Sequence, residues 1–337
     1  IRVSEAGQDG MSNLETDEAR AIYPNVEALG YVVQMHHVLQ PMHDTLPENV
    51  ELLAPASVKK LVNDAASVTV TLQTDTGERQ LTARLLVGAD GTDSRIRSLA
   101  GISCCGWDHN RFGLVASVTT AHGHHDTAYE CFRSTGPLAF LPLADGRFSI
   151  VWSLTPREAA DLMRRSDAEF IAALESAAGP LARGRLGRVM GLNKRACYAL
   201  ESSVAKTFVK GRIVLAGNAA HTLHPVAGQG MNLGLRDVAV LADVLARARS
   251  MDGDPGQPIL LQEYAERRRL DTAAVVGFTE SLLHMFEPDL FPAGWLRSRG
   301  LEALEQVGPL RRFLLGQAAG LGQLPGLRLH GAGGNQS

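Results

Sequence analysis

Residues 211–245 read GRIVLAGNAAHTLHPVAGQGMNLGLRDVAVLADVL. The apolar run 212–216 predicts a buried strand that ends at Gly217 and Asn218. A stretch without helical periodicity follows, and a long amphipathic helix is predicted to start near Met231. Close glycines before a helix leave backbone N–H groups at its positive end, which suits an anion or an electron-rich ring edge. This stretch therefore predicts an α/β fold with a ligand site at the carboxyl end of a strand.

A second glycine turn lies within residues 85–102, LLVGADGTDSRIRSLAGI. A short apolar strand delivers Asp90 and Gly91 at its end, and a short helix is predicted to follow. Ser94 is positioned to cap that helix, and Arg97 can add a charge-assisted contact to a phosphate. A plain turn between strand and helix, with Asp-Gly only for its geometry, is an equally good interpretation of this segment alone.

Between the two turns the pattern changes to short alternating runs with hairpin signals. Strands are predicted at 112–120, 128–133, 138–141 and 147–154, and one helix at 156–178. The sequence thus predicts two interleaved parts, an α/β part and an antiparallel-sheet part. We expect the α/β part at 31–100 and 203–287, the antiparallel part at 1–30 and 101–202, and a C-terminal helical region and tail at 288–337.

The long helix predicted at 232–249 has an apolar side and a charged side. We expect Val238, Leu241, Leu245 and Ala248 to face the core, and Arg236, Asp237, Asp243 and Arg247 to lie on the other side. A further helix is predicted at 261–286, and its run of three arginines at 267–269 is interpreted as a solvated face.

Composition excludes several classes of protein. The 337 residues carry 33 basic and 36 acidic side chains, a net charge of −3, which removes any charge-based argument for nucleic-acid binding. The four cysteines form no CxxC pair, as expected for a reducing, cytoplasmic environment. No apolar run approaches the length needed to span a bilayer.

The remaining candidates are weaker. The His122-Gly-His124-His125 run lacks accompanying ligands, so we expect a solvated loop and no metal site. His221 and His224 are interpreted as structural parts of their loop. Arginines mixed with Trp295 and other apolar residues after Pro288 suit a membrane surface or a lipid-handling partner, although packing on the core is the favoured interpretation.

The two glycine segments together resemble the FAD-dependent aromatic hydroxylases of the p-hydroxybenzoate hydroxylase fold. GADGTDSRIR resembles their DG fingerprint, and LAGNAAHTLHPVAGQGMNLGLRDV resembles their GD fingerprint. Together with GPLAFLPLADGRFSIVW at 136–152 and ALGYVV at 28–33, these segments are most similar to the ubiquinone-biosynthesis hydroxylases. Within that branch they most resemble the 2-octaprenyl-6-methoxyphenol hydroxylase type.

The resemblance implies FAD as cofactor and assigns residues to it. It places Asp90, Gly91 and Arg97 near the pyrophosphate and the nicotinamide, and Gly217 and Asn218 at the ribityl chain and phosphate. It places five further residues along the isoalloxazine ring: Pro225, Gly228, Gly230, Met231 and Asn232. We expect a positive φ at Gly230, so that Gly230→Val abolishes flavin retention. No catalytic residue is assigned.

The implied reaction is hydroxylation of a polyprenylated phenol by O₂ through a C4a-hydroperoxyflavin, with NAD(P)H or another donor as reductant. The alternatives are a hydroxylase of a small soluble aromatic, or a flavin-free subunit that acts only in complex formation. We expect the enzyme in the cytoplasm or peripherally at the inner face of the membrane, in contact with the membrane surface or with other ubiquinone-biosynthesis proteins.

The G-x-G-x-x-G fingerprint of the family's first βαβ unit occurs nowhere in the sequence. We therefore expect that unit to precede Ile1, and we expect the chain as given to fold incompletely or to bind FAD only weakly.

Overall fold

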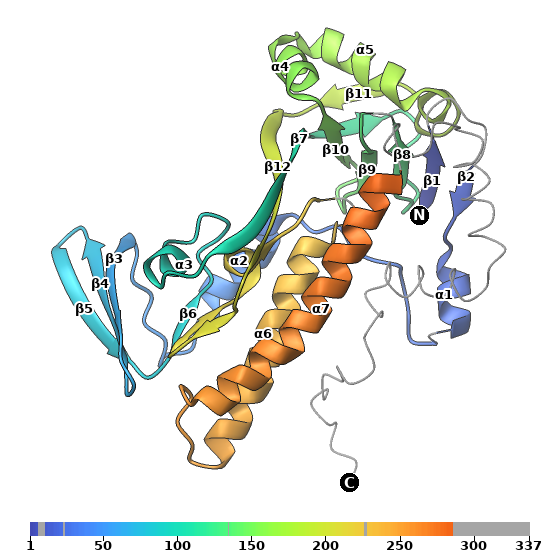
Figure 1. The fold of residues 1–337 in the computed structure, drawn as a ribbon. Helices are drawn as coiled ribbons and strands as arrows, with labels where there is room; N and C mark the ends of the chain where they lie inside the picture. Colours follow the sequence, from blue (N-terminus) through green and yellow to red (C-terminus); the bar gives the residue numbers. More distant parts are fainter. Residues whose placement is uncertain (6–10, 23, 134, 226–227, 286–337) are drawn as a thin grey trace. The chain divides into compact units, whose positions relative to one another are not determined.

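The structure, a computed structural model, describes residues 1–5, 11–22, 24–133, 135–225 and 228–285. Its segments form two compact units that alternate along the chain (Figure 1). Within the described residues, unit 1 comprises 1–46, 109–200 and 280–285, and unit 2 comprises 47–108 and 201–279. Residues 31–46 thus belong to the unit with the antiparallel sheet, and 101–108 belong to the other. The C-terminal region expected at 288–337 lies outside the described residues.

Unit 1 is built on a largely antiparallel sheet. Strands β7 (Cys104–Thr120), β10 (Phe148–Leu154), β9 (Leu138–Pro142) and β8 (Tyr129–Phe132) are consecutive neighbours in it. Strand β1 (Arg2–Glu5) adds to β8 in parallel, and β2 (Met11–Asn13) pairs with β1. Strand β11 (Val189–Leu192) pairs with β7. The predicted strands between the two glycine turns are confirmed.

Two helices complete the core of unit 1, where the sequence predicted one. They are α4 (Pro156–Arg164) and α5 (Asp167–Ala178). The break arises because Ser166 forms a capping box with Glu169, which starts a new helix there. Alternate residues of β10, from Phe148 to Leu154, face the core that these helices cover. Unit 1 also contains α1 (Thr16–Ile22), the single π turn η1 (Ala182–Leu186) and α2 (Met35–Asp44), which buries none of its residues.

Unit 2 contains two three-stranded sheets. One is an antiparallel meander of β3 (Ala56–Asn63), β4 (Val68–Thr74) and β5 (Gly77–Ala83). The other has the order β13 (Val209–Lys210), β14 (Ile213–Leu215) and β6 (Leu86–Gly88). Strands β14 and β6 run parallel, with Leu215 opposite Gly88. The carboxyl ends of two strands far apart in the sequence therefore meet at one edge.

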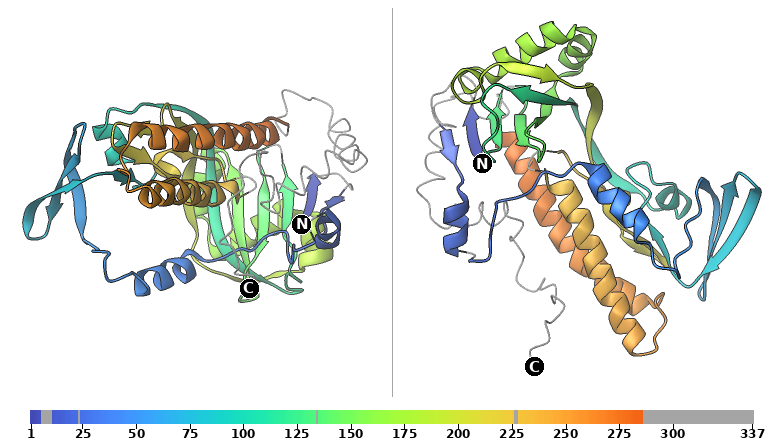
Figure 2. Two further views of the ribbon diagram at one scale, coloured as in Figure 1. Left: turned by 90° about the horizontal axis from the view of Figure 1, so that it is seen from below. Right: turned by 180° about the vertical axis from the view of Figure 1, so that it is seen from behind.

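The helices of unit 2 lie against this second sheet. They are α3 (Arg95–Leu99), α6 (Gln229–Ser250) and α7 (Pro258–Met285), of which residues 258–279 belong to unit 2. Helices α6 and α7 run side by side, as all the views show (Figure 2). Two short elements connect β14 to the loop before α6: a 3-10 turn, Gly217–Ala219, and the strand β15 (His221–Thr222). Strand β15 pairs with the end of β12 (Ala196–Ala205).

The inward face of α6 differs from the prediction. Its buried residues are Gln229, Leu233, Asp237, Val240, Leu241, Val244 and Ala248, whereas Val238 is 59% exposed. The expectation that Asp237 lies on the charged side was wrong, because this carboxylate is enclosed by polar partners that the helical pattern does not show. None of the helices in the described residues is long and apolar enough to cross a bilayer.

Candidate functional site

The two glycine turns lie next to each other in unit 2, at the carboxyl ends of β6 and β14. Gly91 has φ +86° and Gly217 has φ +58°, values that favour glycine. A Cβ atom at either position would meet nothing within 4 Å. The space over both backbones is therefore open to a ligand, and the contacts below connect the two turns.

Asp90 holds the start of α3. Its Oδ1 accepts a hydrogen bond from the Ser94 hydroxyl at 2.5 Å, and its Oδ2 accepts one from the backbone N–H of Ile96 at 3.0 Å. Ser94 in turn accepts from the N–H of Arg97, which confirms it as the cap of this helix. The carboxylate is thus engaged by its own turn, and it shapes the loop in which Gly91 lies.

Arg97 ties the two turns together. Its Nη1 donates to the carbonyl of Ala219 at 2.9 Å, and its Nη2 donates to the carbonyl of Thr92 at 2.8 Å. The Asn218 amide donates to the Thr92 hydroxyl at 3.4 Å, and the hydroxyl of Thr222 reaches the same oxygen at 3.2 Å. The guanidinium therefore fixes the separation of the two strand ends, a role that the sequence did not indicate.

The amino-terminal end of α6 lies in the second segment and has no side-chain cap. Gly228 is its N-cap residue with φ +61°, and no acidic residue occupies the first turn. Gly230 is helical, so the positive φ expected there was wrong: it belongs to Gly228. Met231 and Asn232 are exposed on the first turn, as is Pro225 in the preceding loop. Because a helix cannot satisfy its first N–H groups internally, the amino-terminal end of α6 is a candidate position for a ligand.

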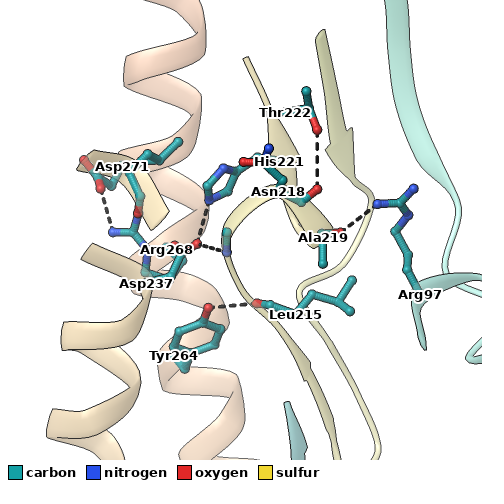
Figure 3. Close-up of polar contacts among 12 residues, drawn as sticks. Arg97, Leu215, Asn218, Ala219, His221, Thr222, Asp237, Tyr264, Arg268 and Asp271 are labelled. Carbon is teal, nitrogen blue, oxygen red and sulfur yellow. Dashed lines mark hydrogen bonds and ion pairs between the residues drawn. The ribbon is translucent and has the colours of Figure 1, made fainter. Parts of the chain in front are cut away.

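Asp237, in the third turn of α6, holds the turn after β14 in place. Its Oδ2 accepts from the backbone N–H of Gly217 and from Nε2 of His221, both at 2.7 Å (Figure 3). His221 and Asp237 are both buried. Gly234 allows this approach, because a Cβ atom there would lie 3.3 Å from the Cα of Gly217. The turn is thus packed closely onto α6, and a side chain at 234 would force Gly217 to move by a few tenths of an ångström.

Arg268 of α7 completes a buried ion cluster. Its Nε donates to Asp237 at 2.5 Å and its Nη1 donates to Asp271 at 2.6 Å (Figure 3). Arg236 binds the other oxygen of Asp271 at 2.8 Å. Burial acts to lower the pKa of Arg268, but the carboxylates of Asp237 and Asp271 outweigh it and raise that pKa. The interpretation of 267–269 as a solvated face was therefore wrong for Arg268, which is fully buried.

Tyr264, also on α7, contacts the strand itself. Its hydroxyl donates to the carbonyl of Leu215 at 2.8 Å, and burial raises the pKa of this phenol, which keeps it a donor (Figure 3). Sequence reasoning missed Tyr264, Arg268 and Asp237. The only signal was the presence of charged residues on both faces of two long helices.

This arrangement fits the flavin that the resemblance implies. Three glycines with positive φ, Gly91, Gly217 and Gly228, leave open space where a Cβ atom would stand. The helix α6, of 22 residues and without a side-chain cap, begins directly after Gly228. The positive amino-terminal end of such a helix suits the electron-rich edge of a ring. The exposed amide of Asn218 both donates and accepts, as a ribityl hydroxyl requires. In the described residues no cluster of His, Cys, Asp or Glu is arranged to hold a metal ion.

Comparison with known proteins agrees with this chemistry. The family model of the FAD binding domain matches residues 42–279. Ubiquinone hydroxylase UbiL of Rhodospirillum rubrum is 37% identical over 303 residues, which cover 88% of this chain and 69% of that protein. The 3-demethoxyubiquinol 3-hydroxylase of Escherichia coli K12 is 33% identical over 295 residues, covering 87% of this chain and 73% of that protein.

Among solved structures, p-nitrophenol 4-monooxygenase PnpA from Pseudomonas putida DLL-E4 has a TM-score of 0.73 at 19% identity, with 95% of this chain and 80% of that chain covered. This likeness shows the shared fold. The family model and the two relatives above 30% identity show more: the chain belongs to the FAD binding domain family, among the FAD-dependent aromatic hydroxylases and within their ubiquinone-biosynthesis branch.

Proposed function

We propose that this chain hydroxylates the aromatic ring of a polyprenylated phenol in ubiquinone synthesis, with a reduced nicotinamide as electron source. The observation that carries the proposal is the open space at each of Gly91, Gly217 and Gly228, near the amino-terminal end of α6. The names of the relatives, ubiquinone hydroxylase and 3-demethoxyubiquinol 3-hydroxylase, support the substrate class. They favour an enzyme of this kind over a flavin-free subunit.

In this proposal the end of α6 faces the isoalloxazine ring. Pro225, Gly228, Gly230, Met231 and Asn232 would line that ring, and the positive end of the helix would favour negative charge on a reduced flavin. A helix N-terminus stabilises such charge by up to about 1 kcal/mol at an exposed site. Met231 and Asn232 are both exposed, so a ligand can reach their side chains.

The two turns serve the rest of the cofactor. Gly217 and Asn218 contact the ribityl chain and phosphate, and Asp90, Gly91 and Arg97 border the pyrophosphate and the nicotinamide region. Because Asp90 and Arg97 already bind their own loops, we assign them mainly the task of holding the backbone in shape. Bound FAD supplies the oxygen chemistry, and the chain orients it and excludes water.

We further propose that unit 2 is the flavin-binding part and that the sheet of unit 1 is the substrate-binding part. A polyprenyl tail is insoluble in water, so the enzyme is expected to meet its substrate at the inner face of the membrane or on another protein of the same pathway. Neither statement requires a helix that spans the bilayer.

The test is a turnover assay with isotopic oxygen. The purified protein, supplied with FAD and NADH or NADPH, is given a short-chain prenylated phenol under ¹⁸O₂. The proposal predicts a product one oxygen heavier, with the label from O₂ on the ring. Labelled hydroxylation of an unprenylated phenol but not of the prenylated one would contradict the substrate class, and the absence of any labelled product would contradict the activity.

A further inference from the structure

Unit 2 contains a cavity whose lining includes no residue of the two glycine turns. It has a volume of about 360 Å³, and it lies between the chain around 204–208, Trp107 of β7, and one face of α7. None of the ten residues proposed for the cofactor lines it. This volume is within the range of small-molecule sites.

The cavity follows α7 for most of its length in this unit. The residues of α7 that line it are Gln262, Ala265, Glu266, Arg269, Thr272, Ala273 and Val276. These positions form a single stripe at helical spacing. At 1.5 Å per residue the stripe is about 21 Å long. The charged side chains of the stripe lie in its amino-terminal half, and the residues of its carboxyl-terminal half are small or apolar. The groove is therefore polar towards one end and apolar towards the other.

The charges favour an anion. Lys206 and Arg269 both line the cavity and are exposed, and neither forms an ion pair within the part of the chain that the structure describes. The one carboxylate in the lining, Glu266, accepts a hydrogen bond from Gln262 at 3.0 Å. By contrast, the neighbouring Arg267 and Arg268 are both paired with aspartates.

A buried polar group also lacks a partner here. Thr272 is 1% exposed, it lines the cavity, and its hydroxyl has no hydrogen-bond partner among the described residues. A buried hydroxyl without a partner destabilises the folded chain. A ligand with an acceptor atom in the groove would satisfy it. The apolar wall opposite includes Trp107, Val204 and Phe208.

We propose that this groove along α7 binds a small anionic amphiphile, whose carboxylate or phosphate meets Lys206 and Arg269 and whose apolar body lies against Trp107 and Val276. The groove combines two cations without ion-pair partners in the described residues, an aromatic side chain and a buried hydroxyl without a partner. A purely polar anion would leave the apolar half unfilled, and a neutral lipid would leave the two cations without a partner. The site is independent of the proposed flavin site.

The experiment uses 10-bromodecanoate below its micelle concentration, because bromine quenches the fluorescence of a tryptophan that it touches. Titrated into the purified chain with saturating FAD present, it is expected to give saturable quenching that is largely lost in Trp107→Phe. The double variant Lys206→Gln/Arg269→Gln should bind at least about tenfold more weakly. The matched control Lys59→Gln/Lys60→Gln, which removes two exposed charges from β3, should bind like the unmodified chain.

Two further arms sharpen the result. Thr272→Val should weaken binding while leaving the unfolding midpoint unchanged or higher, which a merely structural role of Thr272 would not produce. Vesicles of brominated phosphatidylglycerol that quench Trp107 would identify a lipid headgroup as the source of the anion, whereas binding of the free amphiphile alone would identify a soluble one. Equal affinity of the Lys206/Arg269 variant and the control, equal affinity for 10-bromodecanol, or quenching that survives in Trp107→Phe would overturn the proposal.

Discussion

Gly228 and Gly230 lie two residues apart in the second glycine segment, but their backbones differ. Gly228 has φ +61°, and Gly230 is helical with nothing within 4 Å of its Cβ position. Gly228→Ala should therefore lower the free energy of unfolding by about 1–2 kcal/mol. Gly230→Ala should leave it unchanged or raise it by about 0.5 kcal/mol.

Flavin affinity should separate folding from binding in this pair. If the ring lies against the first turn of α6, Gly230→Ala weakens FAD binding although the protein is no less stable. Urea denaturation and a fluorescence titration of FAD measure the two quantities. Unchanged FAD affinity in Gly230→Ala would place the ring elsewhere.

Asp237 is the residue on which the buried cluster depends. Asp237→Asn leaves Arg268 with Asp271 as its only carboxylate and weakens the hold on Gly217 and His221. We expect a loss of roughly 3 kcal/mol in the free energy of unfolding, the usual order for breaking a buried ion pair. The matched control is Asp243→Asn on the same helix, whose ion pairs with Arg247 and Arg267 are partly exposed. It should cost less than about 1 kcal/mol, and an equal cost for the two variants would show that burial of the cluster is unimportant.

At the scale of elements, Arg97 connects α3 to the turn after β14. Arg97→Ala removes two hydrogen bonds to carbonyls of different loops. A loss of roughly 2 kcal/mol is expected, together with weaker FAD binding because the strand ends are no longer fixed. Arg97→Lys should not restore both, since an ammonium cannot span the two carbonyls as a planar guanidinium does. The exposed neighbour Arg95→Ala serves as control, and if it behaved like Arg97→Ala the brace would be refuted.

Strand β8 carries a carboxyl group with an unusual pKa. Burial raises the pKa of Glu130 from 4.5 to about 7, and its cross-strand neighbours are the apolar Val3 and Ala139. Between these pH values the folded chain holds a proton that the unfolded chain releases, so stability falls as pH rises from 4.5 to 7 and stays low above it.

Glu130→Gln should remove this dependence. At pH 8 we expect the variant to be more stable than the unmodified chain by roughly 3 kcal/mol, and at pH 4.5 to match it closely. Urea denaturation at the two pH values measures the difference. The exposed Glu27→Gln in the same unit should show no such gain, and a gain that is equal at both pH values would rule out the proton linkage.

The elements also show what the sequence could and could not predict. Strand ends, glycine turns and the Ser94 cap follow from local pattern, and these were predicted correctly. The inward face of α6 was not, because Asp237 is buried only through partners on α7, on β15 and in the turn after β14. Hydrogen bonds between residues far apart in the sequence cannot be detected from the spacing of apolar residues along one helix. For the same reason the resemblance proposes positions near the flavin but gives no sign of Arg268 and Tyr264, which contact the turn and the strand beside those positions.

At the scale of the whole molecule, the central claim is that one edge of unit 2 holds the flavin: the turns after β6 and β14 and the first turn of α6. The measurement that tests it most directly is amide hydrogen exchange of the purified chain with and without saturating FAD. The account predicts slower exchange on FAD addition at 88–97, 217–222 and 228–232, and little change along the groove face of α7 at 262–276. Protection confined to other segments, or none at these three, would contradict it.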